Sequence, residues 1–375
     1  MNRDFLTKLI KKTFALAKKG EGFVSPNPLV GAVIVKDKKV IATGYHKRAG
    51  LPHAEIEAMR KVKMPLEEAE LYVNLEPCSH WGKTPPCVEE IIRAKFKKVV
   101  IATPDPNPQV RGKSIKKLIQ AGIKVVVGIL PEEAERLNEV FFKNMRKRLP
   151  FVVVKVAQSL DGKIALKSGD SKWITKEETR VFAKMLRDKY DAVLVGINTV
   201  IKDDPSLNGV KKEPHKVVID PSLRIPLDCN LFHKSSKKII IFASPTHNKK
   251  KLSYLKDKAE VVIVTKAKET GMFDLKEILK ILYQKGIMSV FVEGGANTLG
   301  RFFDQAVVDK IYFFFAPRII GGEESLTSVG GEGVRKINEA VEIKDWKFRR
   351  IKDDFLIIGY PKFKVKRKGK KQVKR

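Results

Sequence analysis

The sequence has few cysteines and no long apolar segment, and each shortage excludes a class of protein. Three cysteines in 375 residues, Cys78, Cys87 and Cys229, cannot build a disulfide framework. The longest apolar runs, such as "IKVVVGIL" (123–130), are far shorter than the roughly 18 to 20 residues of a membrane span. Residues 1–20 have the pattern of an amphipathic helix without the apolar core of a signal peptide. We therefore expect a cytoplasmic protein with no membrane partner.

Acidic residues are also scarce relative to basic ones. The sequence has 43 Asp and Glu against 75 Lys and Arg, which gives a formal net charge of +32. Nine of the basic residues and no acid lie in the tail "KFKVKRKGKKQVKR" (362–375), which we expect to be disordered. The rest of the excess is spread over predicted helix faces. This distribution favours a solvated surface that attracts phosphate-bearing ligands, and we expect no specific nucleic-acid partner.

The order of apolar segments predicts two layered α/β domains. A chain of this length can bury more than one core. Strands alternate with helices over residues 1–147, and a second set fills residues 148–361 after the basic, proline-containing stretch "MRKRLP". Strands are predicted at 29–37, 39–46, 69–75, 97–103, 123–129, 151–158, 192–200, 215–220, 238–244, 259–265, 289–295 and 310–317. Helices are predicted at 1–20, 52–62, 85–94, 112–121, 176–188, 274–285 and 297–304.

A histidine and a glutamate, His53 and Glu55, stand at the start of a predicted helix. In the first turn both side chains can lean over the exposed helix N-terminus. Downstream, "EPCSHWGKTPPC" places Cys78 after a strand and Cys87 at the start of a helix, where the helix dipole stabilises a thiolate. One imidazole and two thiolates give three zinc ligands and leave the fourth tetrahedral position to water. We therefore predict one zinc ion per chain, bound by His53, Cys78 and Cys87.

Glu55 completes a catalytic arrangement rather than the ligand set. Zinc acidifies a water molecule, and a nearby carboxylate that is not a ligand can carry the proton to the leaving group. A single His or Cys is usually structural, but His-x-Glu followed by Pro-Cys and a second cysteine is the signature of zinc nucleobase deaminases. The joint pattern predicts hydrolytic deamination with Glu55 as the catalytic proton carrier.

Residues 5–145 resemble the cytidine-deaminase superfamily, which has a three-layer fold. The eight residues between the cysteines in "PCSHWGKTPPC" are more than the common two, and this loop, "SPNPLVGAVIV" and "HKRAGLPHAE" are similar to the deaminase of bacterial riboflavin biosynthesis. The resemblance implies a phosphorylated pyrimidine substrate, 2,5-diamino-6-(5-phosphoribosylamino)pyrimidin-4(3H)-one. It also implies substrate contacts by Asn27 and His80. A turn role for Asn27 and hydrogen bonding within the loop for His80 stay open.

The second half has no G-x-G-x-x-G after a strand, so the Rossmann fingerprint is missing. Instead, "VFVEGGANTLGRFF" (290–303) predicts a strand, a Gly-Gly turn and a helix N-terminus. Backbone N–H groups there are exposed by residues that lack Cβ, which suits a phosphate group. The sequence therefore predicts a nucleotide-binding turn, although a Gly-Gly turn without any ligand is common.

Residues 150–361 resemble the reductase domain of the same riboflavin enzyme, with "AQSLDGKIALKSGDSKWIT" and "AVLVGINTVIKDDPSLN" as further matching segments. The resemblance implies a dihydrofolate-reductase-like α/β fold, NADPH as hydride donor and a homodimer. Trp173 as a core residue, Arg187 as a surface cation, and Asp203 or Asp204 as a turn residue stay open. The implied NADPH contacts are Ala157, Trp173, Thr199, Asp203, Gly295, Ala296, Asn297, Thr298, Leu299, Gly300 and Arg301. The implied substrate contacts are Ser171, Arg187, Leu207 and Glu293.

The phosphate site departs from the pattern of this family. After "DDPSL" the family often has an arginine, whereas this sequence continues "NGVKK". Lys211 or Lys212 can replace the charge but not the bidentate geometry. For the proton that reduction requires, the sequence offers Asp203 and Glu293 as candidates.

These observations predict a bifunctional enzyme of riboflavin biosynthesis, a zinc-dependent deaminase joined to an NADPH-dependent reductase of 5-amino-6-(5-phosphoribosylamino)uracil. One alternative is a tRNA or single-stranded DNA deaminase that uses the basic tail, but it leaves residues 148–361 without a role. A second alternative is a zinc-stabilised binding protein. Such a site would need a fourth ligand, for which His80 is the candidate, and would have no use for Glu55.

Overall fold

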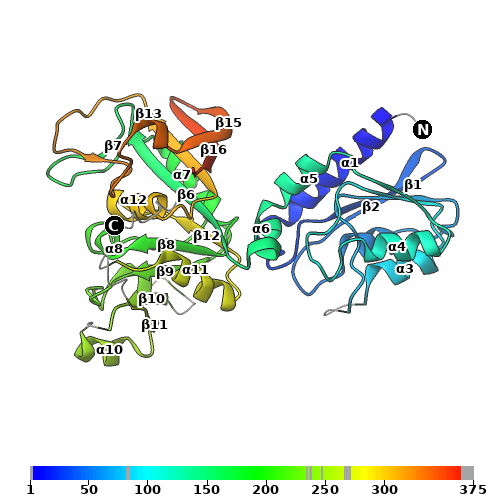
Figure 1. Ribbon diagram of the computed structural model, residues 1–375, viewed down its shortest axis with the longest axis horizontal. Helices are drawn as coiled ribbons and strands as arrows, with labels where there is room; N and C mark the ends of the chain where they lie inside the picture. Colours follow the sequence, from blue (N-terminus) through cyan, green and yellow to red (C-terminus); the bar gives the residue numbers. More distant parts are fainter. Residues whose placement is uncertain are drawn as a thin grey trace, which may run out of the picture. The chain divides into compact units, whose positions relative to one another are not determined.

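The computed structural model describes residues 3–81, 85–233, 235, 239–245, 248–265 and 272–364. Residues 365–375 of the basic tail, for which we expect disorder, lie outside the described residues. The chain divides into two compact units (Figure 1), here called unit 1 (Met1–Pro150 and Leu282–Met288) and unit 2 (Phe151–Ile281 and Ser289–Arg375). In the described parts of both units, no helix combines the length and apolarity needed to cross a bilayer.

Unit 1 is built on a five-stranded sheet with the order β2-β1-β3-β4-β5. β1 pairs antiparallel with both of its neighbours, β2 and β3. β3, β4 and β5 are parallel to one another. The strands are β1 (Gly31–Lys36), β2 (Lys39–Tyr45), β3 (Glu70–Val73), β4 (Lys98–Ile101) and β5 (Lys124–Val127). The helices are α1 (Arg3–Ala17), η1 (Lys18–Gly20), α2 (Ala54–Met59), α3 (Cys87–Arg93), α4 (Lys113–Gln120), α5 (Pro131–Leu137) and α6 (Glu139–Lys147).

Two separate cores cover the two faces of this sheet, because successive strand residues point to opposite sides. Ala32 and Ile34 pack with residues of α2, α3 and α4, whereas Val33 and Val35 pack with residues of α1 and α5. Figure 1 shows α3 and α4 together on one side of the sheet and α1 with α5 on the other. The three-layer arrangement expected for the first half is confirmed.

Unit 2 contains a nine-stranded sheet with the order β11-β10-β9-β8-β12-β6-β13-β16-β15, and a two-stranded ribbon of β14 and β7. The sheet is parallel from β11 to β13, and its last two strands are antiparallel. The strands are β6 (Phe151–Ser159), β7 (Lys163–Ala165), β8 (Ala192–Gly196), β9 (His215–Ile219), β10 (Ile239–Ala243), β11 (Ala259–Ile263), β12 (Ser289–Val292), β13 (Lys310–Ala316), β14 (Leu326–Thr327), β15 (Glu342–Ile351) and β16 (Asp354–Lys362). The helices are α7 (Glu177–Arg187), α8 (Ile197–Asp203), α9 (Asn230–His233), α10 (Lys249–Leu255), α11 (Leu275–Gln284), α12 (Ala296–Asp304) and η2 (Ile337–Glu339). The last turn of α11, from Leu282, belongs to unit 1.

The strand predicted at 192–200 is wrong in its second half. The strand β8 ends at Gly196, and α8 begins at Ile197. A Cβ on Gly196 would lie 2.5 Å from Oγ1 of Thr298, so the missing side chain lets the first turns of α8 and α12 pack closely together. Tertiary packing therefore overrides the strand preference of the β-branched residues in "INTV".

Candidate metal centre and second functional site

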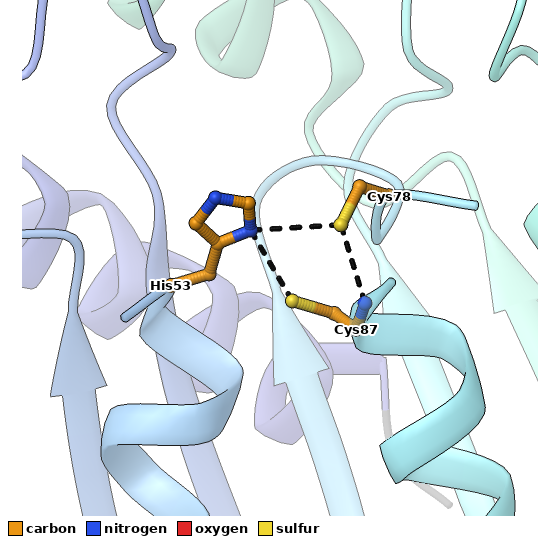
Figure 2. Close-up of side chains that lie close together, drawn as sticks. All are labelled: His53, Cys78 and Cys87. Atoms are coloured by element: carbon orange, nitrogen blue, oxygen red, sulfur yellow. Dashed lines mark hydrogen bonds between the residues drawn. The ribbon is translucent and has the colours of Figure 1, made fainter. Parts of the chain in front are cut away.

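The three predicted metal ligands of unit 1 lie together (Figure 2). His53 precedes α2 in an extended conformation, Cys78 lies in the loop after β3, and Cys87 is the first residue of α3. Nδ1 of His53 is 3.5 Å from Sγ of Cys78 and 3.3 Å from Sγ of Cys87. All three ligand atoms lie within 4.8 Å of one another. The loop and the two helix starts thus bring distant parts of the sequence to one point.

The donor set has the chemistry of a zinc site. The hydrogen bond with Cys87 lowers the pKa of Cys78, which favours the thiolate form of this residue. The same bond and burial raise the pKa of Cys87, which holds its proton until a cation replaces it. Among the described residues the cluster has three members, all soft or borderline donors suited to Zn²⁺. Three protein donors would leave the fourth tetrahedral position of a bound zinc ion to water or substrate.

Glu55, the second residue of α2, is buried beside the cluster. It is 3% exposed, and its Oε2 has no hydrogen-bond partner in the described structure. Burial raises the pKa of Glu55. A buried carboxylate oxygen without a partner is costly unless a water molecule or ligand meets it. Oε2 of Glu55 is therefore available to hydrogen-bond a group bound at the metal centre.

A second histidine, His46, connects Asn27 to the metal centre. Nδ1 of His46 is 3.1 Å from the carbonyl oxygen of Pro52, so Nδ1 carries the proton and Nε2 is free to accept. Nδ2 of Asn27 lies 3.0 Å from this Nε2, and the ring centroids of His46 and His53 are 5.2 Å apart. Burial lowers the pKa of His46, which keeps the ring neutral. The amide of Asn27 is therefore oriented by a residue that our sequence reasoning missed, although His46 opens the segment "HKRAGLPHAE".

His80 is not part of the metal cluster. Its side chain is exposed, in the loop between the two cysteines. Residues 82–84 of the same loop lie outside the described residues.

In unit 2, three charged side chains meet where the carboxyl end of β12 lies beside the middle of β6. Arg187 at the end of α7 forms a two-fold ion pair with Glu293, with Nε to Oε1 at 2.5 Å and Nη2 to Oε2 at 3.1 Å. The Nζ of Lys155 lies 3.8 Å from Oε2 of the same glutamate. Arg187 also donates to the carbonyl oxygen of Asn208. Arg187 is therefore not the exposed surface cation considered from the sequence. Lys155 was not among the residues predicted for this site.

The charges of this cluster fix its protonation states. Although burial favours the neutral acid, the charges of Arg187 and Lys155 lower the pKa of Glu293. Burial lowers the pKa of Lys155. Glu293 is thus ionised, and Lys155 is a more acidic ammonium group than an exposed lysine.

Ser171 and Asp203 line one open pocket of about 240 Å³, together with Lys172 and Lys202. Asp204, by contrast, has a left-handed backbone with φ of 39° and binds Asn230 through backbone and side-chain hydrogen bonds. The turn role considered for both aspartates therefore belongs to Asp204.

Trp173 is not a core residue. It is 60% exposed, and the guanidinium carbon of Arg180 lies 4.3 Å from its ring centroid. Ser171, two positions earlier in the chain, is half-buried. The tryptophan thus presents one ring face to solvent or a ligand while the other face has a cationic partner.

The glycine-rich turn leads into α12 as predicted, with Gly295 as the residue before the helix. No heavy atom lies within 4 Å of the position that a Cβ on Gly295 would take, so the turn is open there. Leu299 is in the core, and a Cβ on Gly300 would lie 2.2 Å from the backbone of Gly330. These two residues of the implied contact stretch are therefore packed within the fold. The partly exposed members are Gly295, Ala296, Thr298 and Arg301, and Asn297 is exposed.

The remaining implied contacts are spread over several elements. Ala157 on β6 and Thr199 on α8 are half-buried, whereas Leu207 is buried with φ of 54°. Lys212 lies 3.7 Å from Asp191 and donates to the carbonyl oxygen of Tyr190, so it is engaged within the fold. Lys211 remains exposed.

Comparisons with known proteins match both units. The family model "RibD C-terminal domain" matches residues 150–357, and "Cytidine and deoxycytidylate deaminase zinc-binding region" matches residues 4–103. The Riboflavin biosynthesis protein RibD of Aquifex aeolicus is 43% identical over 96% of this chain and 99% of its own length. The protein of the same name from Actinobacillus pleuropneumoniae is 39% identical over 93% of each.

Solved structures agree with these matches. Acinetobacter baumannii RibD superposes with a TM-score of 0.86 at 33% identity, covering 96% of this chain and 100% of that one. A deaminase/reductase from Thermotoga maritima superposes with a TM-score of 0.81 at 36% identity, covering 96% of this chain and 99% of that one. The similarity therefore extends over both units.

Proposed function

The chain belongs to the RibD family of bifunctional riboflavin biosynthesis enzymes, and we propose from this membership which residues carry its two reactions. It is a zinc-dependent deaminase in its first half and an NADPH-dependent reductase, with a dihydrofolate-reductase-like fold, in its second. The functional boundaries that we propose are 1–147 for the deaminase domain and 148–361 for the reductase domain, followed by the basic tail.

At the deaminase site, His53, Cys78 and Cys87 hold zinc, which when bound supplies an acidified water molecule. Glu55 takes up a proton of that water and passes it to the amino group, which then leaves as ammonia. The observation that carries this proposal is the buried, unpaired Oε2 of Glu55 beside the three ligand atoms. Oε2 has no hydrogen-bond partner in the described residues, so it can take up and release a proton without breaking a structural bond of its own.

We propose the substrates from the Thermotoga maritima relative, which is named a diaminohydroxyphosphoribosylaminopyrimidine deaminase and 5-amino-6-(5-phosphoribosylamino)uracil reductase. Asn27, oriented by His46, is suited to hydrogen-bond the pyrimidine ring, because its Oδ1 faces away from the imidazole. His80 stays a proposed substrate contact, since an exposed side chain in the inter-cysteine loop can reach a bound ligand.

At the reductase site, NADPH supplies hydride and the protein aligns it with C1′ of the opened ribosyl group. Lys155 is the proposed proton donor, because its pKa is lowered while Glu293 is held ionised. Glu293 is then better suited to accept hydrogen bonds from sugar hydroxyl groups. The proposed NADPH contacts are Ala157, Trp173, Thr199, Asp203 and the stretch from Gly295 to Arg301; the proposed substrate contacts are Ser171, Arg187, Leu207 and Glu293.

The proposed assembly is a homodimer in the cytoplasm, formed through the edge strand β15. Trp346 and Phe348 on this strand are 62% and 58% exposed. The ring of Phe348 lies 5.6 Å from that of the half-buried Phe355, which extends the aromatic surface onto β16. A long edge strand with exposed aromatic side chains is a surface that a second copy of this chain can cover.

A coupled assay tests both reactions at once. Purified enzyme given the diamino substrate and NADPH should release ammonia and consume NADPH in equal amounts. Ammonia release without NADPH consumption would contradict the reductase assignment. If zinc-loaded enzyme neither releases ammonia nor consumes NADPH, both assignments are contradicted.

The nucleic-acid deaminase hypothesis is disfavoured because relatives matched over the whole chain share the reductase half. The binding-protein hypothesis is disfavoured because His80, its fourth ligand, is exposed and outside the cluster.

A further inference from the structure

We propose that Glu76 and Ser114 are positioning residues that clamp the Cys78 loop to the first turn of α4, and so control how firmly the chain retains zinc. This inference rests on the zinc ligands proposed above. It concerns residues that lie outside the ligand cluster and whose side-chain oxygens are bonded to the backbone.

Glu76 is a buried carboxylate whose partners are backbone N–H groups. It is 2% exposed. Its Oε1 accepts from the amides of Ser114 and Ile115 at 3.2 and 3.4 Å, and its Oε2 accepts from those of Gly112 and Asp105 at 3.0 and 3.2 Å. No cationic side chain is paired with Glu76 in the described structure. Four N–H groups and the positive end of α4 therefore balance its charge.

The first turn of α4 requires this partner from outside the helix. The residue before the helix is Gly112, with φ of 78° and no side chain to cap the amides that follow. Glu76, on the loop after β3, supplies the cap that a Ser or Asp would normally supply. One carboxylate thus joins the loop after β3 to both ends of the 105–112 loop after β4.

A second bond fixes the residue between Glu76 and the zinc ligand. Oγ of Ser114 donates to the carbonyl oxygen of Pro77 at 2.5 Å. From the other side, the amide of Cys87 donates to Sγ of Cys78 at 3.2 Å, and the amide of Val88 to the carbonyl oxygen of Cys78 at 3.2 Å. The Cys78 loop is therefore held between the first turns of α3 and α4.

This placement predicts an effect on metal retention. Groups that orient a metal ligand without touching the metal typically change metal affinity by about 10- to 100-fold when they are replaced. Glu76→Gln keeps the volume of the side chain but turns an NH₂ group toward backbone N–H donors. The attachment of the Cys78 loop to α4 through residue 76 is then weakened, while all three ligands stay in the chain.

The test measures zinc release from the full-length, zinc-loaded protein into an excess of a chromogenic chelator. Glu76→Gln should release zinc about ten-fold faster than wild type or more, and Ser114→Ala several-fold faster. Ser114→Ala removes one hydroxyl group and keeps the proposal testable if the glutamine variant does not fold. Wild-type release rates in every folded variant of the pair would overturn the clamp.

Two control variants separate the clamp from general loosening. Asp188→Asn in unit 2 also weakens a carboxylate that accepts several backbone amides, those of Val210, Lys211 and Lys212. Ile10→Val removes a buried methyl group from the opposite face of the unit 1 sheet. Both control variants should release zinc at the wild-type rate. If Ile10→Val releases zinc as fast as Glu76→Gln does, the clamp is also overturned. Wild-type protein without zinc would instead refute the zinc site itself.

Discussion

Two buried glutamates of unit 1 have opposite surroundings, and the contrast separates structural from chemical roles. Both oxygens of Glu76 are satisfied by backbone amides, so its charge is stabilised in one fixed place. Glu55 is equally buried, but its Oε2 has no partner in the described structure and its pKa is raised by burial. Glu55 can therefore gain and lose a proton at Oε2 without breaking a described hydrogen bond of that atom, whereas protonation of either oxygen of Glu76 would disrupt its bonds to backbone amides.

Glu55→Gln should leave zinc bound and lower the rate of ammonia release by about 10²- to 10⁴-fold, since a glutamine cannot carry the proton. Zinc content is measured by atomic emission and ammonia by a coupled assay. The matched control is Glu57→Gln on the same helix, whose carboxylate pairs with Lys47 at the surface and should keep activity. Loss of zinc from the Glu55 variant would make Glu55 a ligand and contradict its role as proton carrier.

Lys155→Met should lower the rate of NADPH consumption by about 10²-fold or more and leave the rate of ammonia release unchanged. The reason is that the variant removes the proposed proton donor while Glu293 keeps its pairing with Arg187. NADPH absorbance measures the effect with the deaminated uracil as substrate. Lys216→Met is the matched control, because Lys216 is also a buried lysine on this sheet and pairs with Glu213. Equal losses in the two variants would indicate damage to the fold.

NADPH should quench tryptophan fluorescence mainly through Trp173, the tryptophan among the proposed contacts. The sequence has three tryptophans, Trp81, Trp173 and Trp346, and all three are exposed. Trp173→Phe should therefore remove most of the quenching, whereas the same change at Trp81 or Trp346 should not. Undiminished quenching in the Trp173 variant would place the cofactor elsewhere.

The residues of the metal centre could be predicted because their types and spacing have few alternatives. Residues that act through a partner were harder to find. A lysine within the apolar run "FVVVKVAQ" gives no sign of Glu293, which lies more than a hundred positions away, and the pairing of β6 with β12 brings Lys155 to it. His46 was missed for the same reason, since its hydrogen bond with Asn27 joins the loop before β1 to the loop after β2.

At the scale of elements, most apolar strands were predictable and mostly polar elements were not, although the apolar strand β16 was also missed. The strands of the unit 1 sheet follow from runs such as "KVVI" (98–101), which are buried throughout. β15 was missed because nearly all its residues are exposed, so it lacks an apolar pattern. α5 and α6 were missed although Pro131 at the helix start and basic residues in the last turn of α6 are helix signals.

The exposed edge of the unit 2 sheet leads to a prediction about assembly. Replacing Trp346 and Phe348 together by lysine should convert the proposed dimer into a monomer, because the aromatic area on β15 would become charged. Sedimentation velocity measures the change, and a stable dimer should bury roughly 1,200 Å² or more in total. Ile263→Lys on β11, the opposite edge of the same sheet, is the matched control and should stay dimeric. A dimer that survives the double change would exclude β15 as the interface.

At the scale of the whole molecule, each unit has its own sheet, its own core and its own chemical site. The metal centre is formed by residues of unit 1 alone, and the charged cluster by residues of unit 2 alone. Neither site takes a described hydrogen bond or ion pair from the other unit. The two reactions should therefore depend on different cofactors and be separable within the intact chain.

Removing zinc tests this separation without truncating the protein. Treatment with a strong chelator should abolish ammonia release, because the three ligands then hold no metal to acidify water. NADPH consumption should stop when the diamino substrate is supplied, since no deaminated product forms. With the deaminated uracil supplied directly, NADPH consumption should continue within about two-fold of the untreated rate, because Lys155, Glu293 and Arg187 do not depend on the metal. Loss of reduction with that substrate as well, reversed by adding zinc, would show that metal binding in unit 1 controls the reductase.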